Sequence, residues 1–417
     1  MGRHEIKPPA TSSTKRPSLA WISVVLAGVM ALSMMPGPII GIFARYFIDE
    51  LGLSRTEIGA VATFQALLIM AVSIPFGRLA DRIGGRNHLI LMLAFFIAGM
   101  VSMSVSWDFW SLLLFAAIAG LPAAGANSAT NTIIVDNVRS GSRGWITGFK
   151  QSGVQVGLLF AGLALPFIAE LLGWRQALAL TTLLAGAVIA LALGVVPRPV
   201  PLHPEAAPTS PEQSGKLPPA VRWLSVYGVT MGVGVGAYSA FAPLFAQETL
   251  GMSVTLSGVV IAVSGGSGTL SRVVWGRIAE QAAHPSVPLI VIGTIAFAAL
   301  TAIWVAPYTT PLLIWVGAIL IGVSLGSWMS VGMMGAIMLS GPRRTGEGTG
   351  LIMLGFGLGL TIGPVLFGWG VDTFGNYHLS WAGVIINCVA AVGMMLVWRL
   401  KTRREVGQVT SGKGSAT

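Results

Sequence analysis

The stretch Leu51-Gly52-Leu53-Ser54, followed by Gly77-Arg78-Leu79-Ala80-Asp81, decides the fold because the chain contains it twice. The second copy is Leu250-Gly251-Met252-Ser253, followed by Gly276-Arg277-Ile278-Ala279-Glu280. Matched positions lie 199 residues apart (250 − 51 = 199 and 280 − 81 = 199). A repeat of this length indicates two homologous halves, and membrane proteins built in this way usually move a solute between them.

The composition places both halves in a membrane. Of the 417 residues, 54% are hydrophobic and only 10% are charged, whereas a soluble domain carries about 25% charged residues. Apolar stretches of the ~20 residues that a bilayer span needs recur along the whole chain. Each is predicted as a helix, because an isolated strand cannot satisfy its backbone hydrogen bonds in lipid. We predict twelve spans, at residues 20–46, 57–77, 88–106, 110–134, 145–169, 174–196, 221–246, 256–276, 287–305, 311–338, 348–371 and 379–399.

A proline-rich stretch divides the spans into two sets of six. Residues 197–220 combine prolines with serine, glutamate and alanine, a composition typical of a linker. A second set of repeated glycines, 202 residues apart, matches the fifth span to the eleventh: Gly148, Gly153, Gly157 and Gly173 recur at Gly350, Gly355, Gly359 and Gly375. We predict an all-α membrane protein of twelve transmembrane helices in two pseudo-symmetric six-helix bundles. The predicted parts are a cytoplasmic tail at 1–18, bundles at 19–196 and 221–400, a cytoplasmic linker at 197–220 and a cytoplasmic tail at 401–417.

The net charge of +10 sets the orientation of the chain rather than a nucleic-acid partner. Most basic residues lie in the tails and in loops that fall on one side of the membrane, as Arg78, Arg82 and Arg86 do. An excess of lysine and arginine marks the cytoplasmic side. The distribution predicts a multi-pass protein of the bacterial inner (plasma) membrane, with both termini in the cytoplasm.

The loop motif and its surroundings resemble the Major Facilitator Superfamily. Gly77-Arg78-Leu79-Ala80-Asp81-Arg82, with Gly84-Gly85-Arg86, is similar to the signature loop between the second and third spans of that family. The resemblance covers essentially the whole chain, and it implies a transporter that rocks its halves around a central cavity. It also implies a latch that holds the halves together in the outward-open state; the alternative is that its arginines only anchor the loops. The predicted latch residues are Gly77, Arg78, Asp81, Arg82, Arg86, Gly276, Arg277 and Glu280.

Charged side chains inside the spans indicate the chemistry of the substrate. None of the fifteen acidic residues falls in the middle of a predicted span, whereas Lys150 and Arg272 both lie within spans. A charge in hydrocarbon costs at least ~2.5–3.5 kcal/mol, so such residues usually face a cavity or a partner. Two cations without a carboxylate would attract an anion. A structural role for Arg272 is the alternative.

Arg272 carries a second resemblance. Ser271-Arg272, four residues before Gly276, resembles the arginine that binds substrate carboxylate in the monocarboxylate and oxalate–formate transporters. The match is partial, because Gly268 stands where monocarboxylate transporters have an acidic residue. The predicted substrate site comprises Arg272, Lys150, Gln151, Asn127, Asn131, Gln65, Tyr238 and Trp328, with Gln155 and Tyr227 as further candidates. For each uncharged member, a helix–helix contact is the alternative.

These patterns together predict a secondary active transporter that moves a small organic anion, a carboxylate, by alternating access with proton symport or exchange. The alternatives are efflux of amphipathic drugs or metabolites and, in another class, a non-transporting membrane sensor. The sequence has no phosphate-binding loop and no His/Cys cluster, so we predict neither an enzyme nor a cofactor or metal. The predicted partners are a small-molecule substrate, with a co-transported proton or an exchanged anion, and the lipid bilayer. We predict a monomer that binds no nucleic acid.

Overall fold

The structure is a computed structural model, and it describes residues 19–139, 142–197, 219–282, 284–340 and 345–413. The predicted tail at 1–18 and most of the predicted linker lie outside these ranges. Within them every regular element is a helix, which confirms the predicted all-α class.

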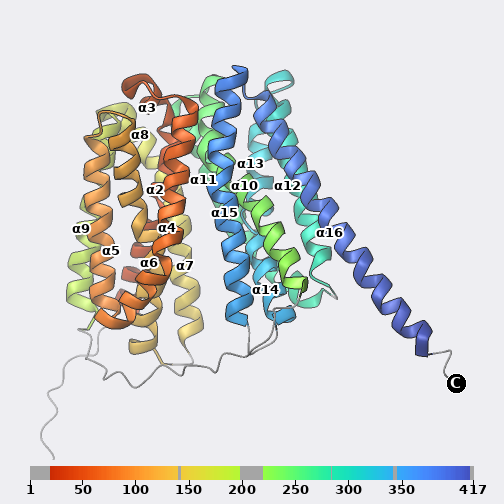
Figure 1. Cartoon of the computed structure of the whole chain (residues 1–417). Helices are drawn as coiled ribbons and strands as arrows, with labels where there is room; N and C mark the ends of the chain where they lie inside the picture. The colour runs from red at the N-terminus through yellow and green to blue at the C-terminus, as the bar shows by residue number, and fades with distance from the viewer. Residues whose placement is uncertain (1–18, 140–141, 198–218, 283, 341–344, 414–417) are drawn as a thin grey trace, which may run out of the picture.

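The two halves of the chain form two groups of helices that stand side by side, with α4 and α15 adjacent between them (Figure 1). The N-terminal half contains α1 (Leu19–Met34), α2 (Pro36–Ile42), α3 (Ala44–Leu51), α4 (Arg55–Ile83), α5 (Gly85–Ser104), α6 (Phe109–Asn137), α7 (Arg143–Leu159), the π-helix η2 (Phe160–Ala164), α8 (Leu165–Leu172) and α9 (Trp174–Val195). The C-terminal half contains α10 (Pro219–Glu248), α11 (Val254–Gln281), α12 (Ser286–Val305), the 3-10 helix η3 (Ala306–Tyr308), α13 (Leu313–Val323), α14 (Trp328–Ser340), α15 (Thr345–Phe374) and α16 (His378–Lys413).

The number of spans agrees with the sequence. Eleven helices or continuous helical runs in the described ranges are long and apolar enough to cross a membrane, and the bent pair of α1 and α2 makes a twelfth. The bend of 40° falls where Pro36 begins α2, because a proline lacks the N–H that would continue the helical hydrogen bonds.

Three predicted spans differ in detail from the observed helices. The tenth is two helices, α13 and α14, with a break between Val323 and Trp328. The fifth contains the wide π turn of η2 just before Pro166, which has no N–H to donate. The twelfth continues as α16 to Lys413, past the predicted end at residue 399, because hydropathy marks where a helix leaves the apolar layer and not where it stops.

The repeated Leu-Gly-x-Ser motif is a helix–turn–helix junction. Gly52 ends α3 with a φ of 68°, in the left-handed region that favours glycine, and Gly251 has the same φ after α10. Ser54 then caps α4 by accepting a hydrogen bond from the Glu57 N–H, and Ser253 caps α11 in the same way. The motif therefore recurs because both helices need one residue with positive φ and one N-cap.

Close contacts join the halves at one end of the bundle. We call this the Arg55 end, because α4 begins there, and the opposite end the Asp81 end, which the distribution of basic residues predicts to be cytoplasmic. A Cβ atom on Gly59 of α4 would lie 2.4 Å from the Pro364 carbonyl oxygen of α15, and one on Gly258 of α11 would lie 2.2 Å from that of Gly162 in η2. Only glycine permits helices to approach so closely.

These two crossings are copies of one another. Gly59 and Gly258 are 199 residues apart, and Gly162 and Pro364 are 202 residues apart, which are the two offsets of the sequence repeat (258 − 59 = 199 and 364 − 162 = 202). The α4–α15 and α11–η2 contacts are thus one repeated pair of helix positions, used twice across the interface between the halves.

Toward the Asp81 end the same helices separate. Glycines near that end include Gly77 of α4, Gly148 of α7, Gly276 of α11 and Gly350 of α15. A Cβ atom at any of these four described positions would meet no atom of the opposite half within 4 Å. The interface between the halves is therefore closed at the Arg55 end and open at the Asp81 end.

Candidate functional site

A small cavity lies between the halves, where the helices begin to diverge. It has a volume of about 160 Å³ and is lined by α2 and α7 from the N-terminal half and by α10, α11, α13 and the α13–α14 break from the C-terminal half. Arg272 is the only charged residue among the described residues that line it. The lining residues are Pro38, Gln155, Leu158, Val235, Tyr238, Ser239, Ile261, Ser264, Gly265, Gly268, Arg272, Ile321, Gly322, Leu325 and Gly326.

The break between α13 and α14 positions Arg272. A broken helix leaves carbonyl groups without intrahelical donors, and in a membrane such groups need partners from the protein. The side chain of Trp275 on α11 donates to the Val323 carbonyl oxygen at 2.8 Å, and Arg272 donates its Nε–H to the Gly326 carbonyl oxygen at 2.9 Å. Among the described residues only the Nε of Arg272 has a hydrogen-bond acceptor, and its two terminal nitrogens have none there.

Gln155 of the other half lines the same cavity as Arg272. Its side chain is only 7% exposed, and its Oε1 is buried without a hydrogen-bond donor among the described residues. This oxygen lies 3.2 Å from the position that a Cβ atom on Gly265 of α11 would take. Gln155 was a further candidate for the cavity lining in the sequence, and the structure places it there.

Lys150 and its neighbours form a separate cluster inside the N-terminal half. The Lys150 side chain is 1% exposed, and its Nζ donates to Thr130 Oγ1 at 2.8 Å and to Asn131 Oδ1 at 2.6 Å. One position further along α7, Gln151 donates to Asn127 Oδ1 at 3.3 Å. The predicted residues Lys150, Asn131, Gln151 and Asn127 are thus brought together. Lys150 is buried and the other three are exposed, and none of the four lines the cavity.

The remaining predicted site residues divide between the cavity and the two bundles. Tyr238 lines the cavity and donates its hydroxyl to the Val260 carbonyl oxygen at 3.4 Å. Gln65 lies inside the N-terminal bundle, where its Nε2 donates to the Ala116 carbonyl oxygen at 2.7 Å. Trp328 is buried in the C-terminal bundle against Tyr227. In this conformation Gln65 and Trp328 therefore contact other helices of their own halves and do not line the cavity.

The predicted latch residues lie at the Asp81 end without ion pairs in the described part of the chain. Arg78, Asp81, Arg82, Arg277 and Glu280 are exposed there. Arg86 donates to the Leu193 carbonyl oxygen of its own half at 2.9 Å. With the halves apart at this end, these side chains do not meet.

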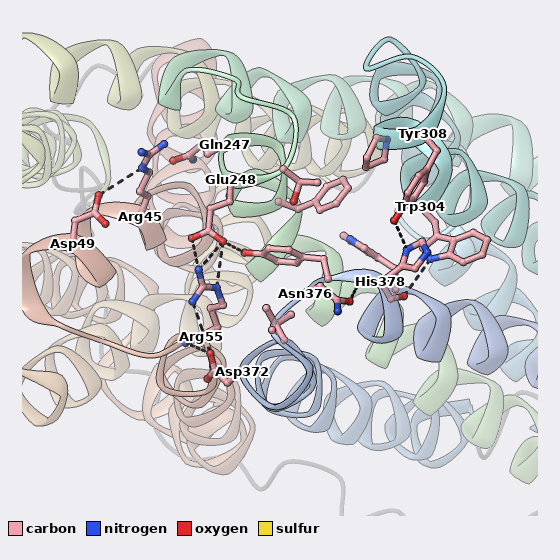
Figure 2. A pocket seen from close by; sticks show the side chains of 17 residues that line it. Arg45, Asp49, Arg55, Gln247, Glu248, Trp304, Tyr308, Asp372, Asn376 and His378 are labelled. Atoms are coloured by element: carbon pink, nitrogen blue, oxygen red, sulfur yellow. Dashed lines mark hydrogen bonds and ion pairs between the residues drawn. The ribbon is translucent and has the colours of Figure 1, made fainter.

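Arg55 and Glu248 join the halves at the opposite end (Figure 2). Arg55 of α4 binds Glu248 of α10 through Nη2, with distances of 2.8 and 3.0 Å to the two carboxylate oxygens, and through Nε at 3.2 Å. The Tyr377 hydroxyl donates to the same carboxylate at 2.5 Å. Burial, followed by the negative charge of Glu248, raises the pKa of Tyr377, so the tyrosine remains a neutral donor.

Asp372, at the end of α15, caps α4 from the other half. Its carboxylate accepts hydrogen bonds from the backbone N–H of Arg55 at 3.2 Å and of Thr56 at 2.6 Å. The first N–H groups of a helix have no partner within the helix and carry partial positive charge. Asp372 therefore satisfies in trans the donors that Ser54 leaves free.

The other repeat makes the equivalent contact. Glu170 of α8 accepts a hydrogen bond from the backbone N–H of Thr255, in the first turn of α11, at 3.1 Å. Glu170 and Asp372 are 202 residues apart, and Thr56 and Thr255 are 199 apart (372 − 170 = 202 and 255 − 56 = 199). The sequence predicts only that Glu170 and Asp372 lie outside the middle of a span, and it assigns them no role. The repeat offsets were the signal that pairs them.

A second, larger cavity of about 1050 Å³ lies at the Arg55 end around this network. Its charged side chains are mostly paired, as Arg45 is with Asp49 at 3.5 Å and Arg55 is with Glu248 (Figure 2). On its far side, the ring of His378 stacks on Trp304 with centroids 4.8 Å apart. This cavity is therefore a vestibule outside the closed contact, whereas the cavity at Arg272 has a charge left for a ligand.

Solved structures of transporters share this fold. A bacterial homolog of the human lysosomal transporter Spinster, in an inward-facing and unoccupied conformation, aligns over 93% of this chain and 96% of its own, with a TM-score of 0.73 and 18% identity. The nucleoside transporter NupG aligns over 90% of this chain and 99% of its own (TM-score 0.75, 13% identity). A D-xylose–proton symporter aligns over 90% and 97% (TM-score 0.71, 14% identity). Identities this low show a common fold.

The family is identified by a match to the sequence. Residues 19–353 match the Major Facilitator Superfamily, which is most of the chain and includes both copies of the loop motif. The twelve-span helical architecture and the transporter neighbours agree with this match. The chain is therefore a membrane transporter that belongs to the Major Facilitator Superfamily, and not an enzyme.

Proposed function

We propose that this transporter moves a small organic anion, a carboxylate, across the bacterial inner membrane by alternating access. In this proposal the Asp81 end is cytoplasmic, and the conformation closed at the Arg55 end is the inward-facing one. Movement is coupled to proton symport or to exchange for a second anion. The cavity at Arg272 is the substrate site, because both halves contribute to it and rocking of the halves would expose it to each side in turn.

The observation that carries the proposal is the state of Arg272. Its guanidinium is anchored through Nε to Gly326, so the terminal N–H groups are held on a fixed fork while they remain available. Such a fork matches the two oxygens of a carboxylate. Since no acidic residue lines this cavity in the described ranges, the arginine has no counter-ion there other than a ligand.

Lys150 supports the anion from inside the N-terminal half. Its Nζ is bonded to the neutral oxygens of Thr130 and Asn131, so its charge is solvated but not neutralised. A buried positive charge acts over several ångströms through the low-dielectric interior. We therefore assign Lys150 a long-range electrostatic role and Arg272 the direct contact.

Transport of labelled small carboxylates into proteoliposomes tests the proposal. We expect Arg272→Gln to reduce uptake at least tenfold and Lys150→Gln to reduce it less, because only the first removes a charge-assisted contact with the anion. Arg272→Lys, which keeps the charge but loses the fork, should fall between wild type and Arg272→Gln. Arg45→Gln is the matched control, since that arginine is exposed at the Arg55 end and paired within its own half.

Two results would contradict the proposal. One is carboxylate uptake that is unchanged in Arg272→Gln while that protein is folded. The other is transport of amphipathic cations in place of acids, which would favour efflux of drugs or metabolites and make Arg272 a helix-capping residue only.

A further inference from the structure

The break between α13 and α14 leaves three backbone carbonyl groups without the donors of a continuous helix. In such a helix each N–H donates to the residue four positions earlier. The N–H groups of Gly326, Ser327 and Ser330 donate instead to the carbonyl oxygens of Ile321 at 2.9 Å, Ser324 at 2.9 Å and Ser327 at 3.0 Å. The three carbonyl groups that these N–H groups do not reach are those of Gly322, Val323 and Gly326.

Two side chains of α11 donate to two of these carbonyl groups. Trp275 donates its Nε1–H to the Val323 oxygen at 2.8 Å, and Arg272 donates its Nε–H to the Gly326 oxygen at 2.9 Å. An indole has a single N–H, whereas a guanidinium has several. Trp275 is therefore fully used by this contact, and Arg272 is not.

Two hydroxyl groups serve the third carbonyl group. The Gly322 oxygen lies 2.8 Å from Ser327 Oγ and 3.4 Å from Ser271 Oγ, and the two hydroxyl oxygens are 2.6 Å apart. Both serine side chains are buried. Each of the three carbonyl groups thus has a side-chain donor without any use of the terminal nitrogens of Arg272.

The guanidinium is the neighbouring donor that would replace the indole. Arg272 and Trp275 are three positions apart on α11, so their side chains lie on the same side of the helix. A carbonyl group without a donor is unfavourable inside a membrane protein, and a charged N–H is a strong donor. Without the indole N–H, a terminal N–H of Arg272 would turn to Val323, and the fork that matches a carboxylate would be lost.

Trp275 does not itself contact a ligand in the cavity. Its side chain is 7% exposed, and it is not among the described residues that line the cavity at Arg272. Its one N–H is bonded to Val323. Any influence of Trp275 on a bound anion therefore acts through Arg272.

Resting on the proposed function, we propose that Trp275 is a positioning residue for the anion. It occupies the Val323 carbonyl group, so that the terminal N–H groups of Arg272 stay available to a carboxylate. Ser271 and Ser327 have the same role at Gly322. The affinity for the substrate then depends on an indole N–H that does not touch the substrate.

Calorimetric titration of the purified full-length transporter tests this role. The probes are acetate, propionate and succinate at pH 8, and the acid that wild type binds most tightly is used for the variants. We expect Trp275→Phe, which removes the N–H and keeps a large ring, to bind this acid about fivefold or more weakly than wild type.

Trp275→His separates donation from packing. Histidine keeps a five-membered ring with an N–H, and it is neutral at pH 8 because its ordinary pKa is ~6.5. We expect Trp275→His to bind more tightly than Trp275→Phe, because only the histidine can donate to Val323. A residue that only fills space predicts the reverse order, because phenylalanine is closer to tryptophan in volume.

Trp304→Phe is the matched control. Trp304 also donates its Nε1–H to a backbone carbonyl oxygen of the C-terminal half, that of His378 at 3.2 Å, but it does not line the cavity at Arg272. Its loss should change the affinity by less than about twofold, because it leaves the donors of the α13–α14 break in place.

A second variant tests the proposal if Trp275→Phe fails to fold. Ser271→Ala combined with Ser327→Ala leaves Gly322 without a side-chain donor, and it should weaken binding in the same direction. Ser380→Ala is its control, because that hydroxyl donates to a backbone carbonyl group of α15.

The outcomes separate this inference from the proposed function. Three results would overturn the role of Trp275 while the carboxylate site at Arg272 stands: unchanged affinity in Trp275→Phe, weaker binding by Trp275→His than by Trp275→Phe, or an equal loss from Trp275→Phe when Arg272→Gln is already present. Absence of binding by all three acids, or binding that is indifferent to Arg272→Gln, would overturn the proposed function and this inference with it.

Discussion

The two ends of the interface between the halves use the same chemical groups in opposite ways. At the Arg55 end, carboxylates of one half sit on helix N-termini of the other, as Asp372 does on α4 and Glu170 does on α11. At the Asp81 end, Asp81 and Glu280 are exposed and make no ion pair with described residues. Helix ends and carboxylates are present at both ends, so the conformation is determined by which set of them is in contact.

This difference suggests how one conformation gives way to the other. Each interaction at the Arg55 end is worth little alone, because exposed ion pairs and helix caps contribute about 0.5–2 kcal/mol each. Conformational states of a transporter differ by a few kcal/mol, so such interactions are large enough to set the populations. The comparison can be tested by removing the interactions at one end at a time.

The largest effect is expected from Asp372→Ala combined with Arg55→Gln. These changes remove the trans cap on α4 and the ion pair to Glu248. The population closed at the Arg55 end should fall by between about twofold and thirtyfold for each of these two interactions. Spin labels at Trp107 and Thr310, in loops of the two halves at that end, would report a longer distance. Cys388, the single native cysteine, is buried and should not be labelled.

Glu170→Ala makes the matched test of the repeated contact. It removes one hydrogen bond, to Thr255, where Asp372 accepts from two backbone N–H groups and from the Thr56 hydroxyl. We therefore expect the same direction of change as for Asp372→Ala and a smaller amplitude. A Glu170 variant with no effect on the label distance would show that the two crossings contribute unequally to the stability of this conformation, although they lie at matched positions of the repeat.

Asp81→Asn should shift the equilibrium in the opposite direction. If Asp81 forms its contacts only when the Asp81 end is closed, as the predicted latch requires, its loss destabilises that state and leaves the present one unchanged. The same label pair should then show a shorter mean distance and a larger population closed at the Arg55 end. A longer distance would contradict the latch and leave the arginines of this loop as membrane anchors.

The smallest effect is expected from pH at the Asp81 end. His284 Nδ1 accepts the Ser286 N–H at 3.2 Å, and burial, followed by the nearby Arg399, lowers the pKa of His284. Because the folded protein disfavours the protonated ring, the stabilisation is present above the ordinary histidine pKa of ~6.5 and is lost as the pH falls through the lower, folded pKa. The melting temperature of wild type should fall more than that of His284→Gln between pH 7.5 and 5.5. If the melting temperatures of the two proteins change equally with pH, titration of His284 does not contribute to stability.

The spans and the repeat could be predicted from the sequence, because both depend on residue type and spacing alone. The direction in which each helix face points, toward the cavity or into its own bundle, could not be predicted from the sequence. A membrane helix is apolar all round, so nothing in the sequence shows that Gln155 faces the cavity while Gln65 faces its own bundle. Asn131, a neighbour of Lys150, is among the predicted residues, yet the position of Lys150 outside the cavity lining depends on how α6 packs on α7.

The contacts between the halves could not be predicted from the sequence for a different reason. Asp372 and Glu170 could be matched by the 202-residue offset, but their partners depend on which helices meet across the interface and at what register. Arg272 shows the same limit, since the break that anchors its Nε at Gly326 falls inside the stretch that hydropathy predicts as one continuous tenth span.

The π turn of η2 makes the two repeated crossings mechanically unequal. At one crossing, α15 passes Gly59 as a single continuous helix with Pro364 inside it. At the other, the equivalent helix widens over Phe160–Ala164 at the point where it passes Gly258. A wide turn has fewer regular backbone hydrogen bonds to resist twisting, so bending during the transport cycle should concentrate in the fifth span. The fifth span would then bend more than the eleventh during the transport cycle. The two copies of the repeat would therefore contribute unequally to the conformational change.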